Sequence, residues 1–337
     1  MLKLITILGV SLLIVLHELG HFLLARAFGM RVHKFSVGFG PALLSRRFGE
    51  TVWQLAAVPL GGYVQIQGMG GEETDPGDGH GFKDKPRWQR ALVLLGGPIA
   101  NWVVAAVCLM LLASTVGLRD LATPSTEIDV VEEGSAAARA GLQAGDHILA
   151  VDGAPLPGWD ALVTLIRNHP ETPMAFTVSR GGASLAITAT PARSGDHGVL
   201  GVQPAARLMT YGVGAGLVAG LRQTVSLTFE QTRLLWGVLT FQRDGKLSGL
   251  PGIVKTLSAQ AKKSFGRFFD TLATLSLVLF ILNLAPLPAL DGGRLAFLGV
   301  EAIRRRPVSE TVEAWVHGVG LVLLLGLIVF VSVRDML

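Results

Sequence analysis

Hydrophobic positions along this chain are gathered into four long apolar runs, which are separated by polar or mixed segments. The runs cover residues 4–28, 91–118, 271–290 and 315–333. Each holds about 20 residues or more, the helix length needed to cross roughly 30 Å of hydrocarbon. The pattern predicts a polytopic α-helical membrane protein with about four transmembrane helices. We place these helices at residues 1–30, 91–118, 269–293 and 314–334.

A second pattern follows the first apolar run, where short stretches of alternating polarity are separated by Gly and Pro. The stretches are KFSVGFG at 34–40, TVWQLAAV at 51–58 and YVQIQ at 63–67. Alternation with period two is typical of half-buried strands, and the intervening Gly and Pro favour turns. Residues 31–90 are therefore expected to form a β-hairpin region followed by a loop.

Residues 126–192 have the character of a soluble, β-rich domain inserted between the second and third apolar runs. They contain four candidate strands and one amphipathic helix, DALVTLIRNH at 160–169. The stretch GSAAARAGLQAGDHILAVDG at 134–153 resembles the signature of PDZ domains in their circularly permuted bacterial form. Such domains bind extended peptides by adding a strand to a sheet edge. We therefore expect one PDZ domain here.

Residues 205–268 have helical spacing but only moderate hydrophobicity. Their apolar pattern is interrupted by charged residues, namely Arg207, Arg222, Glu230 and Arg233. A further crossing in this segment would invert the orientation of everything that follows. We expect amphipathic helices that lie on the outer face of the membrane.

Composition and charge support a membrane protein and set its orientation. Charged residues make up 16% of the chain, against about a quarter in an ordinary soluble domain. The net charge of +4 does not indicate a nucleic-acid partner, because basic residues lie in loops beside apolar runs; the lipid bilayer is the expected surroundings. The basic loops 29–90 and 291–313 belong in the cytoplasm by the positive-inside rule, which puts 118–270 outside. The single Cys108 excludes an intramolecular disulfide.

The first apolar run contains the sequence LHELGHFLL, which is unusual inside a membrane segment. On a helix, His17 and His21 lie one turn apart on the same face, and both imidazoles can bind one Zn²⁺. Glu18 lies near that face and can act as a general base toward water activated by the metal. Ionisable groups inside a span are costly and usually functional. A cleaved signal peptide is the alternative for this segment, but signal peptides do not carry such polar groups in their apolar core.

A catalytic zinc site needs a third protein ligand and one open position. The third apolar run ends in ILNLAPLPALDGGRL at 281–295, where Pro286 and Pro288 break the helix. Freed backbone groups at such a break are tolerated only inside protein or beside a cavity. The first and third runs cross the membrane in the same direction, so Asp291 should emerge at the level of the two histidines. The sequence therefore predicts Asp291 as the third zinc ligand.

These motifs, in this order, resemble the site-2 protease family of intramembrane zinc metalloproteases. The resemblance rests on HELGH, GGPIANW at 96–102, one PDZ domain in the outer loop and NLAPLPALDGG at 283–293, and it covers nearly the whole chain. It is closest to the bacterial branch of regulators of sigma-E protease, in a form with one PDZ domain rather than two. A further departure is Gly96, where the family usually has Ala.

The resemblance implies roles for individual residues. It makes His17, His21 and Asp291 zinc ligands and Glu18 the catalytic base. Substrate handling near the zinc would involve four further residues, namely Asn283, Asn101, Gly97 and Pro98. The 32–68 stretch would be a membrane-associated β-hairpin that holds substrate as an extended strand.

The resemblance also implies a setting and a reaction. The protein would lie in the bacterial cytoplasmic (inner) membrane with its PDZ domain on the extracytoplasmic side. It would hydrolyse peptide bonds within transmembrane segments of anti-sigma factors or signal-peptide remnants. Two other classes remain open, an inactive membrane-tethered PDZ scaffold and a zinc transporter. The transporter would need a polar path through several spans, whereas the second and fourth offer only Asn101 and His317.

Overall fold

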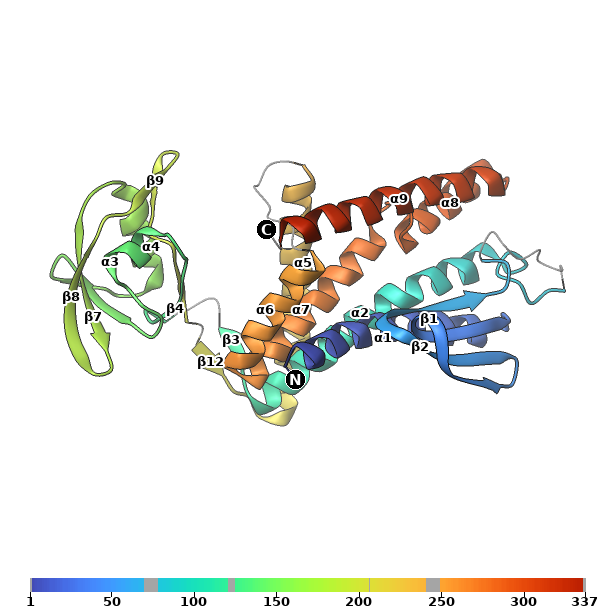
Figure 1. The fold of residues 1–337 in the computed structure, drawn as a ribbon, viewed down its shortest axis with the longest axis horizontal. Helices are drawn as coiled ribbons and strands as arrows, with labels where there is room; N and C mark the ends of the chain where they lie inside the picture. Colours follow the sequence, from blue (N-terminus) through green and yellow to red (C-terminus); the bar gives the residue numbers. More distant parts are fainter. Residues whose placement is uncertain (1, 70–77, 121–124, 206, 241–248, 336–337) are drawn as a thin grey trace. The chain divides into compact units, whose positions relative to one another are not determined.

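The chain folds as two compact units in a computed structural model, in which the second unit is inserted into the first (Figure 1). The larger unit joins Met1–Thr115 to Tyr211–Leu337, and the inserted unit is Val116–Thr210. The structure describes residues 2–69, 78–120, 125–205, 207–240 and 249–335. Residues 70–77 of the loop expected within 31–90, and 241–248 of the segment expected at 205–268, lie outside the described residues.

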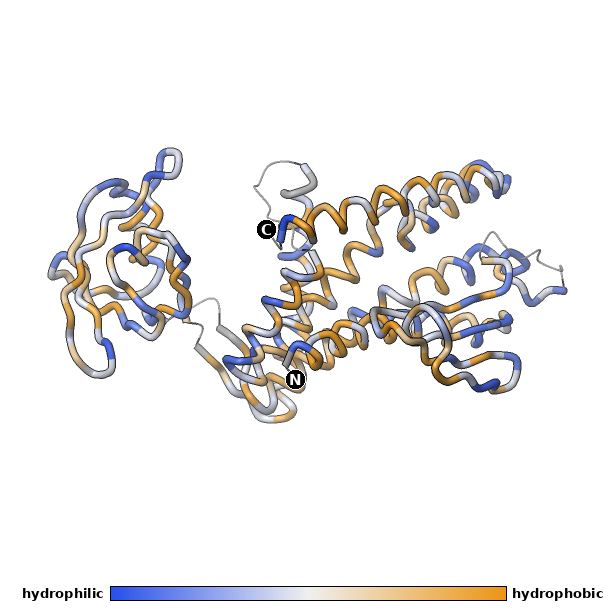
Figure 2. The backbone as a smooth tube through the Cα atoms, viewed as in Figure 1, coloured by the Kyte–Doolittle hydropathy of each residue, from blue (hydrophilic) through white to orange (hydrophobic). Residues whose placement is uncertain are grey.

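The larger unit is built mainly of long helices. Its described helices are α1 (Leu2–Ala27), α2 (Arg87–Thr115), α5 (Val213–Leu239), α6 (Leu250–Lys263), α7 (Phe265–Leu284), α8 (Asp291–Arg304) and α9 (Glu310–Arg334). Among the described residues, four helices are long and apolar enough to cross a membrane, namely α1, α2, α7 and α9. Figure 2 shows these helices as mainly hydrophobic along their lengths. The four-span prediction therefore matches the helices by length and composition.

Helix α2 is at the centre of this unit, because α1, α5 and α7 all pack against it. The α1–α2 contact is unusually close where Gly20 faces Gly96. A Cβ on either glycine would run into the backbone carbonyl of the other. Small residues at a crossing allow two helix backbones to approach closely, which is how membrane helices gain packing contacts. This close crossing brings the polar face of α1 against α2.

The third spanning helix is shorter than the sequence indicated. We expected a helix over 269–293, but α7 begins at Phe265 and ends at Leu284. The chain then forms a loop over 285–290, and Asp291 begins a new helix, α8. Pro286 and Pro288 lack the N–H groups that a continuing helix would need, which explains the early end.

The connection between the third and fourth spans is also not a simple loop. Residues 291–313 contain the 14-residue helix α8 before α9 begins at Glu310. Leu298, on one face of α8, packs into a cluster with Leu94 of α2 and Phe82. The basic residues of this connection predicted its side of the membrane but gave no indication of the apolar face of α8.

Helix α5, in the segment expected at 205–268, packs antiparallel to α2. Gly216 lies against Ser114, Gly220 lies against Met110, and the Trp102 indole N–H donates to the Thr228 hydroxyl at 3.1 Å. The two helices therefore run side by side over about three turns. The placement of this segment on the outer face of the membrane stays a prediction.

Two long strands, β1 (Val32–Phe48) and β2 (Thr51–Ile66), pair antiparallel and pack beside α1. They bend at glycines with positive φ, Gly38, Gly40 and Gly61. As a result the first part of β1 pairs with both ends of β2: Phe35 is opposite Val64 on one side and Trp53 on the other. The stretch 62–66 is left with one strand neighbour in the described pairing, so it is an edge of this small sheet.

The inserted unit is rich in short strands and contains two helices. Its strands are β3 (Leu118–Asp120), β4 (Ile128–Val131), β5 (His147–Val151), β6 (Ala154–Pro155), β7 (Met174–Arg180), β8 (Ala183–Ala189), β9 (Ala192–Ser194), β10 (His197–Val199), β11 (Val202–Pro204) and β12 (Arg207–Met209). Its helices are α3 (Ala136–Ala140) and α4 (Trp159–Asn168). The main sheet has the order β6-β5-β7-β8, all antiparallel.

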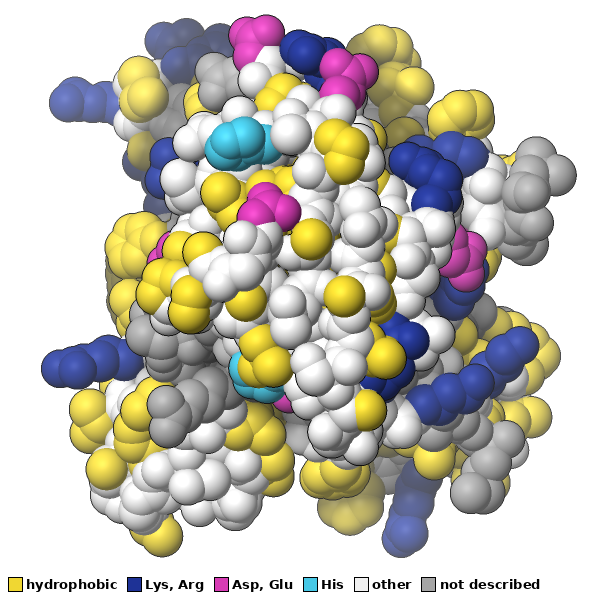
Figure 3. Space-filling view, turned by 90° about the vertical axis from the view of Figure 1, so that its left-hand side faces the viewer, with side chains coloured by type: hydrophobic (Ala, Val, Ile, Leu, Met, Phe, Trp, Pro, Cys, Tyr) yellow, Lys and Arg dark blue, Asp and Glu magenta, His cyan; other side chains and the backbone are white. Residues whose placement is uncertain are grey.

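This unit has a hydrophobic core of its own. Phe176, Ile148 and Leu162 are fully buried in it, so the main sheet and α4 share one core. The buried carboxylate of Asp146 accepts two short bonds from Arg180, at 2.6 and 2.7 Å, and one from the Gln143 N–H. At the centre of the face seen in Figure 3, hydrophobic side chains are scattered among backbone and uncharged side chains of other kinds.

Candidate metal centre

The two histidines of the HELGH sequence lie on the buried face of α1. Their side chains are only 9% and 4% exposed, and their Nε2 atoms are 3.2 Å apart. The spacing of four residues places both rings on one face of the helix, as expected from the sequence. His17 and His21 thus direct one nitrogen each to a common point.

Asp291 reaches the same point from α8. Its Oδ2 atom lies 3.1 Å from His17 Nε2 and 3.3 Å from His21 Nε2. Because α7 ends at Leu284, the 285–290 loop turns the chain back and presents this first residue of α8 to α1. The structure therefore brings together the three residues that the sequence had grouped as zinc ligands.

The donor atoms fit a zinc ion. The Val93 carbonyl can only accept, so the 2.7 Å bond to His21 Nδ1 fixes the proton on Nδ1 and leaves a lone pair on Nε2 of the neutral ring. That lone pair faces the carboxylate oxygen of Asp291, which is buried without a hydrogen-bond partner among the described residues. With the ring neutral, two lone pairs face each other, an arrangement that a cation between them would stabilise. Ligands at about 2.0–2.2 Å from a tetrahedral zinc lie roughly 3.3–3.6 Å apart, close to the spacing here.

Asn101 of α2 contacts His17, the other histidine of the pair. Its amide nitrogen lies 3.2 Å from His17 Nδ1, its amide oxygen is buried without a hydrogen-bond partner among the described residues, and the residue is 1% exposed. A zinc-binding Nε2 leaves the proton of the neutral ring on Nδ1, which the amide oxygen can accept once the Asn101 amide is turned by 180°; this turn also gives the unpartnered oxygen a donor. Ser276 of α7 in turn donates to the Asn101 carbonyl at 2.8 Å, which ties a third helix to this position.

Gly97 of α2 lies so close to the two histidine rings that a side chain at this position would collide with them. A Cβ on Gly97 would lie 2.5 Å from His17 Nε2 and still closer to His21 Nε2. Any side chain at this position would therefore occupy the point where the ligands converge. Pro98, its neighbour, is buried within the helix.

Glu18 lies beside the ligands but has a different partner. Its Oε2 accepts a hydrogen bond from the Val64 N–H of β2 at 3.1 Å. Glu18, His21 and Asp291 line a cavity of about 390 Å³ together with Tyr63, Val64, Gln65, Ile66, Met69, Ala289, Leu290 and Arg294. The edge stretch of β2 therefore forms a wall of the site next to the carboxylate.

Asn283 is an expected site residue that contacts neither this cavity nor the two histidines in the described interactions. Its amide donates to the Leu279 carbonyl of its own helix at 3.0 Å, and it is not among the residues lining the cavity. Gly97 and Asn101 contact the histidines, as described above. The substrate-handling roles of Asn283, Asn101, Gly97 and Pro98 stay predictions.

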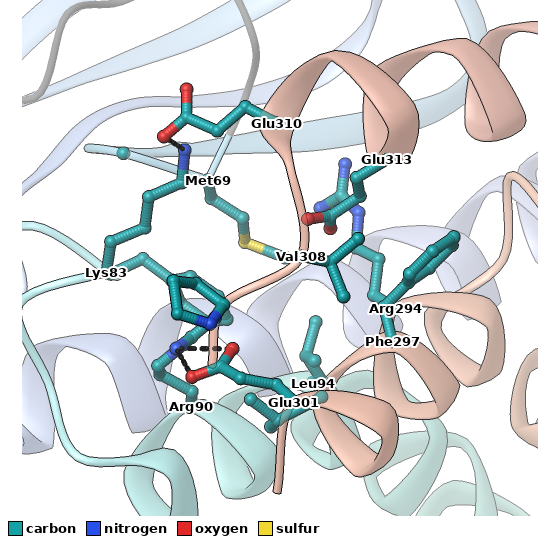
Figure 4. A pocket seen from close by; sticks show the side chains of 14 residues that line it. Met69, Lys83, Arg90, Leu94, Arg294, Phe297, Glu301, Val308, Glu310 and Glu313 are labelled. Atoms are coloured by element: carbon teal, nitrogen blue, oxygen red, sulfur yellow. Dashed lines mark hydrogen bonds and ion pairs between the residues drawn. The ribbon is translucent and has the colours of Figure 1, made fainter. Parts of the chain in front are cut away.

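A second cavity, of about 300 Å³, lies next to the first (Figure 4). Met69 and Arg294 line both cavities. Two ion pairs cross the second one: Lys83 with Glu310 at 2.7 Å, and Arg90 with Glu301 at 3.2 Å. These contacts connect Lys83 to α9 and Arg90 to α8. Charged side chains therefore line the second cavity.

Comparison with known proteins decides the family. The model of peptidase family M50 matches residues 5–327. The chain belongs to peptidase family M50. As an M50 peptidase the protein is a zinc metalloprotease, and its four long apolar helices make it a polytopic membrane protein.

Individual relatives agree with the M50 assignment along almost the whole chain. Two proteins that carry the name zinc metalloprotease, from Synechocystis sp. and Nostoc sp., are 35% and 33% identical to it. They cover 97% and 96% of this chain, which spans 92% and 93% of theirs. A regulator of sigma E protease from Salmonella typhi is 30% identical over 96% of each chain.

Several residues that shape this M50 site were not found from the sequence. Val93 and Val64 act through backbone groups, which carry no sequence signal. Ser276 looked like an ordinary small residue of an apolar run. His317 had been noted only as a polar residue in the fourth span, yet its Nδ1 accepts the Ala289 N–H at 2.9 Å.

Proposed function

We propose that His17, His21 and Asp291 hold the zinc and that Glu18 is the general base of peptide hydrolysis. The observation that carries this is the convergence of three buried donor atoms, with Glu18 on the wall of the same cavity. When bound, zinc lowers the pKa of water and polarises the scissile carbonyl. Glu18 takes a proton from the attacking water and passes it to the leaving nitrogen. The Val64 N–H holds Glu18 in place for both transfers.

We infer that the substrate is a transmembrane segment of another membrane protein, cleaved after it unwinds. The two histidines lie on α1, and Asp291 follows the loop after α7; α1 and α7 are both long enough to span a membrane. A helix hides its carbonyls in its own hydrogen bonds, so a local extended stretch must form first. Free backbone groups are costly in lipid. The edge at 62–66 lines the cavity and can receive such a stretch as an added strand.

We also infer that the β1–β2 sheet is associated with the membrane. Its tip exposes Leu43, Leu44 and Phe48, each about two-thirds exposed, beside Arg46 and Arg47. Apolar side chains next to basic ones are typical of a surface that inserts into the headgroup region.

The inserted unit is proposed to be a circularly permuted PDZ domain on the extracytoplasmic side of the bacterial inner membrane. Its four-stranded sheet, helix α4 and the turn before Asp146 support this assignment. The name of the Salmonella relative supports an anti-sigma factor as one substrate, and a signal-peptide remnant is the other. A PDZ domain outside the membrane can admit or reject substrates by their outer parts.

A Glu18→Gln substitution tests this function. It keeps the shape of the side chain and removes its ability to take a proton. We expect cleavage of a model transmembrane substrate in proteoliposomes to fall about 10²–10⁴-fold, while zinc content stays equal to that of the wild type. Glu133→Gln, on the exposed surface of the inserted unit, is the matched control and should cleave normally.

Other outcomes separate the alternatives. Wild-type cleavage by the Glu18→Gln protein would show that Glu18 is not the base. An inactive scaffold would cleave in neither form. A zinc transporter would move zinc across the vesicle membrane, and the Glu18→Gln form would move it at the same rate.

A further inference from the structure

The loop that presents Asp291 has an unusual backbone. Ala289, two residues before Asp291, has a φ of +70°. A residue with a Cβ rarely adopts this left-handed conformation, because the side chain crowds the following carbonyl. Such a conformation persists only where neighbouring groups hold it in place. The hydrogen bonds of the loop show which groups hold it here.

The backbone N–H groups of residues 285–290 have few partners outside the loop. Pro286 and Pro288 have none. Carbonyls within residues 281–287 accept the N–H groups of Ala285, Leu287 and Leu290. The remaining donor, Ala289, bonds outside the loop, to His317 Nδ1 of α9 at 2.9 Å. Among the described residues, this bond is the loop's only hydrogen bond to α9.

The His317 ring also lies against the first turns of α8. A Cβ on Gly293 would be 3.2 Å from His317 Cε1, and the Phe297 ring centroid is 5.5 Å from that of His317. The imidazole is therefore positioned between the loop and the helix that Asp291 begins. Its own rotation is restricted by these contacts.

Gly320, a second residue of α9, is packed closely against the same loop. A Cβ on Gly320 would collide with Pro288, lying 3.1 Å from its carbonyl carbon and closer still to its Cβ. Gly318, half a turn away, has nothing within 4 Å of the same added atom. The contact is therefore specific to the face of α9 that carries His317 and Gly320.

We propose that His317 is a positioning residue of the zinc site: it holds the 285–290 loop in the conformation that directs Asp291 at the two histidines. Helix α9 supplies no ligand, but through His317 and Gly320 it sets where the third ligand lies. This inference rests on the proposed role of Asp291 as a zinc ligand.

The first test measures zinc affinity in the purified full-length protein by competition with a chelator. His317→Leu replaces the imidazole, which carries the acceptor, by an apolar side chain of similar size. Loss of a group that orients a metal ligand weakens metal binding about 10–100-fold, and we expect a loss in this range. His317→Gln retains an acceptor and should lose less. Leu323→Ala, on an exposed face of α9, is the control and should match the wild type.

The second test uses the backbone of Ala289 itself. Glycine adopts positive φ without strain, so Ala289→Gly should make the loop conformation less dependent on its partner. We expect the Ala289→Gly/His317→Leu protein to bind zinc at least three times more tightly than the His317→Leu protein. A purely structural role for His317 in α9 packing would give no such recovery.

The glycine pair provides a test that does not depend on His317 variants being stable. Gly320→Ala should weaken zinc binding by displacing Pro288, while Gly318→Ala should leave it unchanged. Equal zinc affinities for these two proteins, or wild-type affinity in His317→Leu, would overturn the inference. Asp291→Ala distinguishes a failure of the proposed ligand set from a failure of the proposed role of His317. If it keeps zinc affinity, the proposed ligand set itself is wrong; if it alone loses zinc, only the role of His317 is wrong.

Discussion

Each histidine of the proposed zinc site uses one ring nitrogen for a protein partner and directs the other at Asp291. His21 is held by the Val93 carbonyl and His17 by the Asn101 amide. The Val93 carbonyl determines that Nδ1 of His21 carries a proton, and the Asn101 amide restricts the rotation of the His17 ring. Metal-binding histidines depend on such contacts for both tautomer and orientation.

Replacing Asn101 by Leu should therefore weaken zinc binding without unfolding the protein. The Leu side chain fills the space but cannot accept the proton of His17 Nδ1, so the ring loses its orientation. We expect a loss in zinc affinity of about 10–100-fold in chelator competition. Asn168→Leu, at the end of α4 in the inserted unit, is the control. Unchanged zinc affinity in the Asn101 variant would contradict this role.

Gly97 gives a sharper test because the added atom would lie inside the ligand cluster. Gly97→Ala puts a methyl group within 2.5 Å of His17 Nε2, closer than any real non-bonded contact. We expect zinc content of the purified protein to fall at least tenfold, as for loss of a group that orients the ligands. Gly299→Ala on α8 has nothing within 4 Å and should bind zinc normally.

At the residue scale, the sequence was sufficient to group His17, His21 and Asp291, which the structure brings together, and insufficient to find the residues that contact them. The spacing of His17 and His21 places them on one helix face, and the parity of the spans places Asp291 at their level. Asn101 could be named, but its contact with His17 depends on how closely α1 crosses α2. The role of His317 depends on the path of the 285–290 loop, which no periodicity encodes.

At the scale of elements, the helices and the β-sheet meet at Glu18. Val64 lies on the edge of the sheet, and its N–H donates to the Glu18 carboxylate of α1. The sheet thus contributes a backbone donor to the proposed base while its edge lines the cavity.

A pair of substitutions at Val64 isolates that backbone donor. Val64→Pro removes the N–H and is tolerated best at a sheet edge, whereas Val64→Ala shortens the side chain and keeps the N–H. A hydrogen bond to a charged group contributes about 1.5–3 kcal/mol, so turnover of the Pro variant should fall roughly tenfold or more with zinc content unchanged. Equal turnover in the two variants would show that the Val64 N–H does not position Glu18.

Elements with strong periodicity were predictable, whereas their interruptions were harder to locate. The four spans follow from apolar length, and the alternating stretches at 34–40, 51–58 and 63–67 lie in β1 or β2 except for Gln67, which follows β2. The predicted 269–293 helix was too long at its C-terminal end, because apolar residues continue past Leu284 although the prolines stop the helix. Helix α8 was missed because its basic residues resembled a cytoplasmic loop.

At the scale of the whole molecule, the two units have separate cores and should respond to pH separately. In the inserted unit, the Arg180 guanidinium holds the pKa of the Asp146 carboxyl below its usual range. A depressed folded-state pKa stabilises the fold at pH values above the unfolded pKa of about 3.9 and loses that contribution as pH falls below it.

Urea unfolding of an excised 116–210 segment at pH 6 and pH 3 checks this expectation. The wild-type segment should lose more stability between the two pH values than an Asp146→Asn segment, whose amide does not titrate. Asp196→Asn, on an exposed turn, should behave as the wild type does. The same loss in the Asp146→Asn segment would show that other carboxylates account for the acid sensitivity.

The position of Asp291 has a consequence for how the protein is made. About 270 residues separate it from His21, so at about 5–20 residues per second a ribosome needs roughly 15–50 s to synthesise the interval. During that time α1 carries two histidines and no carboxylate partner from α8. With the proposed ligand set, a nascent M50 chain cannot complete its zinc site until Asp291 has been synthesised.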